Sequence, residues 1–184
     1  MSRIEDEELV VLEGDEEAIE VGRHADVGRM LLLTPVSEVK RRTRPVTLPA
    51  DATVARAVEL MVKKKISAVM VVEPRKPHRL AGIFTERDFL LRSGTLRGLG
   101  RVQLKKVMTR DPESLRASDS VAYALQKMSV GRFRHVPLVD DLGIPVDMIT
   151  TRDLVDFIVE LCPEEILNLP SQPKLAFHPE REGA

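Results

Sequence analysis

A four-residue pattern, Thr-x-Arg-Asp, occurs twice in the chain, as Thr85-Glu-Arg-Asp88 and as Thr150-Thr-Arg-Asp153. In both copies a short apolar run precedes the pattern and a further apolar stretch follows it, which is typical of a strand leading into a helix. A threonine followed three residues later by an acid predicts a capping box for the exposed N–H groups of the first helical turn. The same turn offers donors for a phosphate and an acceptor for sugar hydroxyls. The pattern therefore predicts a nucleoside-phosphate site at each helix start, in addition to its capping role.

The two copies of this pattern each close one copy of a longer internal repeat. Residues 48–61 align with residues 115–128 at a constant offset of 67, and the apolar residues in both follow helical spacing. Thr53 and Ser120 precede these two helices and are suitable N-caps. A β-branched run, a polar turn and a second apolar run follow in each copy, which predicts an antiparallel hairpin that leads into the Thr-x-Arg-Asp helix.

Each repeat thus has the order strand, helix, strand, strand, helix, with short leading strands before Pro49 and Leu115. This order predicts an α+β fold made of two β-α-β-β-α repeats. The predicted organisation is an acidic N-terminal extension at residues 1–33, a first repeat at 34–93, a glycine-containing linker with the second repeat at 94–160, and a proline-containing C-terminal tail at 161–184.

The formal net charge of −1 is the sum of unlike blocks. Residues 1–20 carry a net charge of −8, residues 40–110 of +13, and residues 111–184 of −6. Such asymmetry indicates an anionic partner for the basic block 40–110. One tyrosine, five phenylalanines and no tryptophan disfavour a base-stacking surface, so nucleic acid is the less favoured partner.

The cysteine and apolar content predict the compartment and the class of protein. Cys162 is the one cysteine of the chain, which fits a reducing, cytoplasmic setting. The longest apolar runs are too short to span a bilayer, and no N-terminal stretch reads as a signal peptide. No serine or cysteine lies in a nucleophile motif, and no His/Asp/Glu set has metal-ligand spacing. We therefore expect a protein with no membrane association, no metal site of its own and no catalytic residue.

Several segments together resemble a known family, the CBS domain pair or Bateman module. Residues 82–90 and 147–155 are similar to its two terminal signatures, residues 133–140 to its central strand, and residues 107–112 to the start of its second repeat. The resemblance covers roughly residues 34–160. It implies an α+β module with pseudo-twofold symmetry and two clefts between the repeats. It also implies a regulatory homodimer that binds AMP, ADP, ATP or S-adenosylmethionine and signals to an unidentified regulated protein.

The resemblance also implies roles for matching positions. Asp88 and Asp153 are expected to accept hydrogen bonds from ribose hydroxyls. Thr85 and Thr150 are expected to contact phosphate or ribose, and Arg87 and Arg152 to lie near phosphates. His135 is expected to be a strand residue that packs beside a cleft. The residues expected to flank the base, chiefly through their backbone, are Val46, Ser67, Ala68, Val69, Pro112, Arg134, His135, Val136 and Pro137.

One departure from the family pattern distinguishes the two expected clefts. Asp147 stands where the second signature usually has glycine, and its carboxylate is expected to disfavour a phosphate chain there. The basic block 40–110 surrounds the first signature instead. We therefore predict that a polyphosphate prefers the cleft with Asp88, with Mg²⁺ entering only together with ATP. Two alternatives stay open: a nucleic-acid-associated protein that uses the basic block, and a structural dimerisation module with empty clefts.

Overall fold

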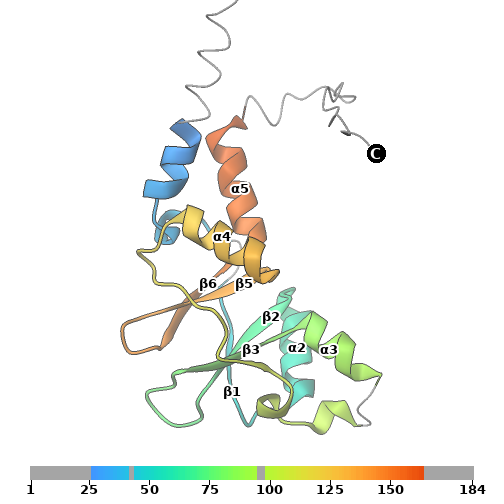
Figure 1. Cartoon of the computed structure of the whole chain (residues 1–184). Coiled ribbons are helices and arrows are strands. Elements are labelled where there is room, and N and C mark those ends of the chain that lie inside the picture. The colour runs from blue at the N-terminus through green and yellow to red at the C-terminus, as the bar shows by residue number, and fades with distance from the viewer. Residues whose placement is uncertain (1–25, 42–43, 95–97, 164–184) are drawn as a thin grey trace, which may run out of the picture.

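The two sequence repeats form two lobes stacked one above the other (Figure 1). The computed structural model describes residues 26–41, 44–94 and 98–163; most of the acidic extension and of the C-terminal tail lies outside these ranges. Each lobe combines helices with an antiparallel hairpin, so the predicted α+β fold is confirmed. In the described part of the chain, no helix is long and apolar enough to cross a membrane.

The first lobe contains the predicted sequence of elements. The N-cap hydroxyl of Thr53 accepts a hydrogen bond from the Arg56 N–H at 3.3 Å. The first helix of the lobe buries its apolar face and ends at Lys64, and its C-cap Lys65 adopts a left-handed conformation with φ of 54°. The elements are β1 (Thr47–Pro49), α2 (Val54–Lys64), β2 (Ala68–Val72), β3 (Leu80–Thr85) and α3 (Glu86–Ser93).

The second lobe repeats this plan with one difference. Its elements are α4 (Val121–Gly131), β5 (His135–Val139), β6 (Pro145–Thr150) and α5 (Thr151–Leu161). The leading strand expected before Leu115 is reduced to a single parallel bridge between Leu115 and Leu138. The preceding segment instead forms β4 (Thr109–Arg110), which pairs with β3 and completes the four-stranded sheet β1-β2-β3-β4 of the first lobe. The second repeat has no leading strand of its own here because the backbone of Thr109 and Arg110 pairs with β3 of the first repeat.

Each hydrophobic core is completed by the segment that leads into the other repeat. Leu104, in the short helix η3 (Leu104–Lys106), is buried in the first core, and its N–H donates to the Ala52 carbonyl at 2.8 Å. Val36, in the short helix η1 (Val36–Glu38), is buried in the second core, and its N–H donates to the Asp119 carbonyl at 2.7 Å. The two exchanges are equivalent under the pseudo-twofold symmetry that relates the repeats. Each hydrophobic core therefore depends on residues of the other repeat.

A smaller apolar cluster joins the two lobes directly. Ala68 and Met70 of β2 and Ile83 of β3 pack with Met148 of β6, and all four side chains are buried. The hairpin loops also meet, because the Leu80 N–H donates to the Gly143 carbonyl at 2.9 Å. The lobes are therefore packed into one unit, with strand and helix ends of both repeats close to each other.

Candidate functional site

Both Thr-x-Arg-Asp patterns form the predicted capping boxes. At α3 the Thr85 hydroxyl accepts from the Asp88 N–H at 3.3 Å, and Asp88 Oδ2 accepts from the Thr85 N–H and hydroxyl at 2.9 and 2.8 Å. At α5 the equivalent distances between Thr150 and Asp153 are 3.2, 2.8 and 2.6 Å. Asp88 is half-buried, whereas Asp153 is only 5% exposed. The local capping role is therefore confirmed at both helices.

Two clefts lie between the repeats, each beside one capping box. The first cleft, next to the start of α3, has a volume of about 420 Å³, and the second cleft, next to the start of α5, about 380 Å³. The first cleft is lined by Ser67, Ile83, Thr85, Glu86, Arg87, Asp88, Leu91, Thr109, Asp111, Pro112, Glu113, Arg132, Phe133, Arg134 and His135. The second is lined by Pro45, Lys65, Ile66, Ser67, Glu86, Arg134, His135, Met148, Thr150, Thr151, Arg152 and Asp153.

The clefts bring together the predicted side chains of the two signatures but leave some strand residues outside. The predicted residues that line a cleft are Ser67, Thr85, Arg87, Asp88, Pro112, Arg134, His135, Thr150, Arg152 and Asp153. Ala68, Val69, Val136 and Pro137 are buried in the hairpins and line neither cleft. Val46 packs against the first hydrophobic core instead. The physical reason is that these strands are covered on both faces: Val69 packs in the first core, and its neighbour Ala68 packs in the apolar cluster between the lobes.

A hydrogen bond between the repeats separates the two clefts. Ser67 Oγ and His135 Nε2 lie 2.7 Å apart, and both residues line both clefts. Burial lowers the pKa of His135, and the nearby Arg134 guanidinium lowers it further, while Asp153 acts in the opposite direction. The His135 imidazole is therefore neutral at pH 7, and its hydrogen bond with the Ser67 hydroxyl joins two uncharged groups.

Several charged lining residues were missed by the sequence analysis. Lys65 and Arg132 occupy equivalent positions in the repeats, and both end their helices in the left-handed conformation, with φ of 54° and 53°. Their matching positions at the offset of 67 were a usable signal. Glu86 lines both clefts although it is an exposed residue in the first turn of α3. No sequence pattern marks it, because its place depends on how the two repeats pack.

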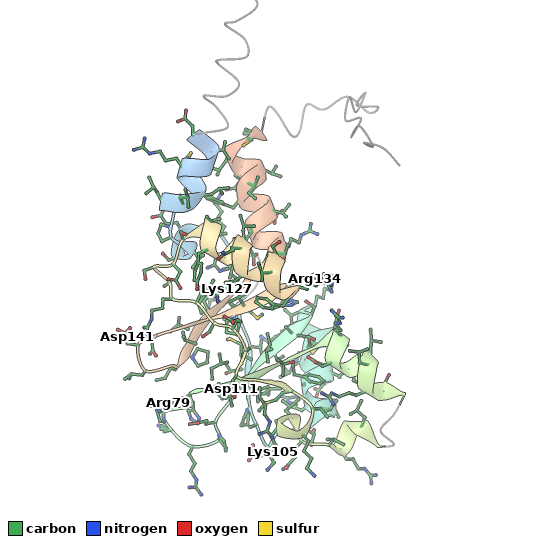
Figure 2. All side chains as sticks on the ribbon, in the orientation of Figure 1. Arg79, Lys105, Asp111, Lys127, Arg134 and Asp141 are labelled. Atoms are coloured by element: carbon green, nitrogen blue, oxygen red, sulfur yellow. The ribbon has the colours of Figure 1, made fainter. Side chains whose placement is uncertain are left out.

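The prediction that the basic block makes the first cleft more suitable for polyphosphate is not supported by the cleft linings. The carboxylates of Asp111 and Glu113 line the first cleft, in addition to those of its own signature. Figure 2 shows Asp111 on the loop between the lobes and Lys105, from the basic block, on the outer side of the first lobe. Within the basic block, Lys65 lines the second cleft and Arg87 the first, whereas Lys105 lines neither.

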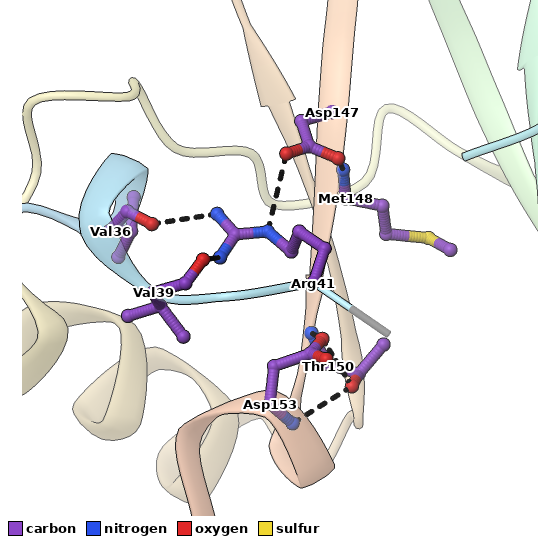
Figure 3. A network of polar contacts seen from close by, with 7 residues as sticks. All are labelled: Val36, Val39, Arg41, Asp147, Met148, Thr150 and Asp153. Atoms are coloured by element: carbon purple, nitrogen blue, oxygen red, sulfur yellow. Dashed lines mark hydrogen bonds and ion pairs between the residues drawn. The ribbon is translucent and has the colours of Figure 1, made fainter. Parts of the chain in front are cut away.

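Asp147, the unusual residue of the second signature, is engaged in an ion pair (Figure 3). Its Oδ2 lies 3.2 Å from Nε of Arg41, while its Oδ1 accepts from the Met148 N–H at 2.8 Å. The Arg41 guanidinium also donates to the Val36 carbonyl at 2.7 Å and to the Val39 carbonyl. The negative charge of Asp147 is therefore balanced by the Arg41 guanidinium. Asp147 does not line the second cleft.

The equivalent residue in the first repeat, Gly82, faces a different environment. A Cβ built at Gly82 would lie 2.6 Å from both the Met108 Sδ and the Thr109 carbonyl oxygen. The first repeat thus needs glycine for the close approach of β4 to β3, whereas the second accommodates an acid with a basic partner.

Comparison with known proteins identifies the family. The profile of the CBS domain matches residues 36–94 and again residues 104–160. The chain belongs to the CBS domain family. Among solved structures, a CBS domain protein PAE2072 from Pyrobaculum aerophilum, complexed with AMP, is 26% identical with a TM-score of 0.63, covering 71% of this chain and 99% of that one. The CBS domain of a membrane protein from Sphaerobacter thermophilus is 24% identical with a TM-score of 0.62, covering 76% and 96%.

Relatives with longer chains also contain CBS domains. The Arabidopsis thaliana CBS domain-containing protein CBSX3, mitochondrial, is 34% identical over 127 residues, which are 65% of this chain and 59% of that protein. A Schizosaccharomyces pombe protein, meiotically up-regulated gene 70 protein, is 33% identical over 71% of this chain but only 17% of its own length. The CBS pair of this chain thus spans only part of these relatives.

Proposed function

We propose that this CBS pair is a regulatory module that binds an adenosine-containing ligand between its repeats and signals to a partner protein. The observation that carries the proposal is that each cleft is built from both repeats. The first cleft combines the start of α3 with Arg134 of the second repeat, and the second combines the start of α5 with Ser67 of the first. A ligand held there favours one relative orientation of the repeats, which is a population shift that a partner can read.

The side chains of each cleft suit the parts of an adenosine ligand. In the first cleft, the hydrogen bonds that the Asp88 carboxylate accepts both go to Oδ2, so Oδ1 has no partner within the described residues and is available to a ribose hydroxyl. In the second cleft, Arg152, on the first turn of α5, is exposed and suited to a phosphate; its counterpart in the first cleft is Arg87. Ile83, Leu91 and Phe133 add an apolar surface for a base. The AMP complex of the related P. aerophilum protein supports this ligand class.

We propose that the module has no catalytic activity of its own, in keeping with the generally regulatory role of CBS domain proteins. Within the described ranges, no group of three or more His, Cys, Asp or Glu side chains is arranged to hold a metal ion. Mg²⁺ would therefore enter only as the counterion of ATP. A cytoplasmic location is proposed from the single cysteine.

We further propose that the partner includes a second copy of the chain. Helices α2 and α3 leave Val62 74% exposed and Leu90 69% exposed. These residues line a groove of about 490 Å³ between the two helices, together with Phe89. Most of the groove's lining is apolar, with the charged residues Lys65 and Glu86 also present, and exposed apolar surface of this kind is typical of a protein interface. Light scattering at micromolar concentration should report a dimer, and a monomer would contradict the proposal.

A thermal-shift screen tests the ligand proposal. We expect AMP, ADP, ATP or S-adenosylmethionine to raise the Tm, because a ligand that binds only the folded state at about 100 times its Kd stabilises it by about 2.7 kcal/mol. For a chain of this length that is about 5 to 11 °C. Asp88→Ala should reduce the shift caused by a ligand held in the first cleft, and Asp51→Asn, at an exposed turn that lines neither cleft, should not.

The screen also separates the alternatives. If none of these ligands raises the Tm, the clefts are empty and the module is structural. Nucleic-acid binding through the basic block would appear in a gel shift whose affinity falls steeply as salt rises.

A further inference from the structure

The first cleft is lined by more carboxylates than cations. Glu86, Asp88, Asp111 and Glu113 contribute acids, and Arg87, Arg132 and Arg134 contribute guanidinium groups. Glu113 is itself engaged, because its Oε2 accepts from the Lys127 ammonium at 2.9 Å, and this hydrogen bond raises the pKa of Lys127. Even with Lys127 counted, the surroundings of the first cleft have no excess of positive charge.

The second cleft has the opposite balance. Lys65, Arg134 and Arg152 line it, against the carboxylates of Glu86 and Asp153. Asp153 is buried, and its Oδ2 is held by the N–H and hydroxyl of Thr150. The Asp88 carboxylate of the first cleft accepts the same two hydrogen bonds from Thr85, so this pair of acids does not distinguish the clefts.

Two nearby titratable groups, Asp147 and His135, do not change the balance of positive and negative charge in either cleft. Asp147, which precedes Met148 of the second cleft, is paired with Arg41 at 3.2 Å and is not part of the lining. His135 lines both clefts, and burial lowers its pKa, so it contributes no charge to either at pH 7. Each cleft is lined by three cations, because Arg132 of the first cleft matches Lys65 of the second, so the difference comes from the additional acids Asp111 and Glu113 in the first cleft.

We propose that the two clefts select ligands of different charge. The second cleft takes a phosphorylated adenosine ligand, and the first takes an adenosine ligand without phosphate, either neutral or cationic. This inference rests on the proposed adenosine-binding function and assigns a ligand class to each cleft. The physical reason is Coulomb repulsion, because a phosphate chain in the first cleft lies among acids that have no surplus of cations to offset them. The same acids leave a neutral ligand unaffected and attract a cationic one.

Matched charge reversals distinguish the two clefts. Arg87 and Arg152 occupy equivalent positions in the first turns of α3 and α5, and both are exposed. Glutamate is favourable in a first helical turn, so Arg87→Glu and Arg152→Glu should both fold. The full chain and each variant are titrated calorimetrically with ATP and with adenosine. We expect Arg152→Glu to weaken ATP binding at least tenfold and Arg87→Glu to change it less than twofold, with adenosine binding retained in both.

A gain-of-function variant provides a second test. Asp111 has φ of 42°, and asparagine tolerates this left-handed conformation. Asp111→Asn combined with Glu113→Gln removes two acids from the first cleft, and we expect it to add a second ATP-binding event. Loss of ATP binding in Arg87→Glu alone, with adenosine binding intact, would overturn the cleft assignment while leaving the proposed function in place. If neither ATP nor adenosine bound the unaltered chain, the proposed function would fail and the assignment with it.

Discussion

Replacing Gly82 by alanine tests how closely β4 must approach β3. The added Cβ would lie 2.6 Å from the Met108 Sδ and 2.6 Å from the Thr109 carbonyl oxygen. The Met108 side chain is flexible and can move aside. The Thr109 carbonyl belongs to backbone that pairs with Ile83, so it can move only by disturbing the β3–β4 ladder. The substitution should therefore displace β4 and the segment that follows it.

The expected cost follows from two opposing effects. Overpacking of this kind costs about 1 to 3 kcal/mol. Removing the freedom of glycine in the unfolded chain returns about 0.4 to 1 kcal/mol. The clash is larger, so we expect Gly82→Ala to lower the free energy of unfolding by about 1 to 2 kcal/mol and the Tm by about 2 to 8 °C. Because Thr109 and Asp111 line the first cleft, ligand affinity there should fall while the second cleft keeps its affinity.

Urea unfolding followed by circular dichroism measures the stability change, and calorimetry measures the two binding events. Gly94→Ala is the matched control, because nothing lies within 4 Å of a Cβ at that position and its backbone is right-handed helical. The control should be neutral or slightly stabilising. A Gly82→Ala protein as stable as the unaltered chain would refute the argument that the close approach of β4 requires glycine.

Two other predictions concern the second lobe and the contact between the lobes. The side chains of the Arg41–Asp147 pair are only 13% and 31% exposed, so we expect a coupling energy of about 1 to 3 kcal/mol between them. A double-mutant cycle of Arg41→Ala and Asp147→Ala, followed by urea unfolding, measures this energy. Additive effects of the two substitutions would contradict the prediction. Burial lowers the pKa of His135 below the ordinary histidine value of 6.5. Below that pH the unfolded chain therefore binds more protons than the folded chain, and the free energy of unfolding should fall as the pH drops. His135→Gln should flatten this part of the Tm profile between pH 5 and 8, and an unchanged profile would assign the pH dependence to other groups.

Local patterns in the sequence predict most of the elements. The N-caps Thr53 and Ser120 and the capping boxes at Thr85 and Thr150 form as expected. Each depends on residues within three or four positions along the chain, and that range is what helix capping and amphipathic spacing require. The internal offset of 67 also predicts two equivalent halves, and the two lobes are built on one plan.

The sequence by itself thus determined the repeated elements, the capping boxes and the family, whereas the tertiary structure decided which charges face each cleft. The block 40–110 has a net charge of +13, yet within it Lys65 lines only the second cleft and Lys105 lines neither, while Asp111 and Glu113 line the first. The exchange of leading segments between the cores and the Arg41–Asp147 pair were equally absent from any local pattern. The physical reason is that these contacts join residues far apart in the chain, and packing of the two repeats against each other determines which of them meet.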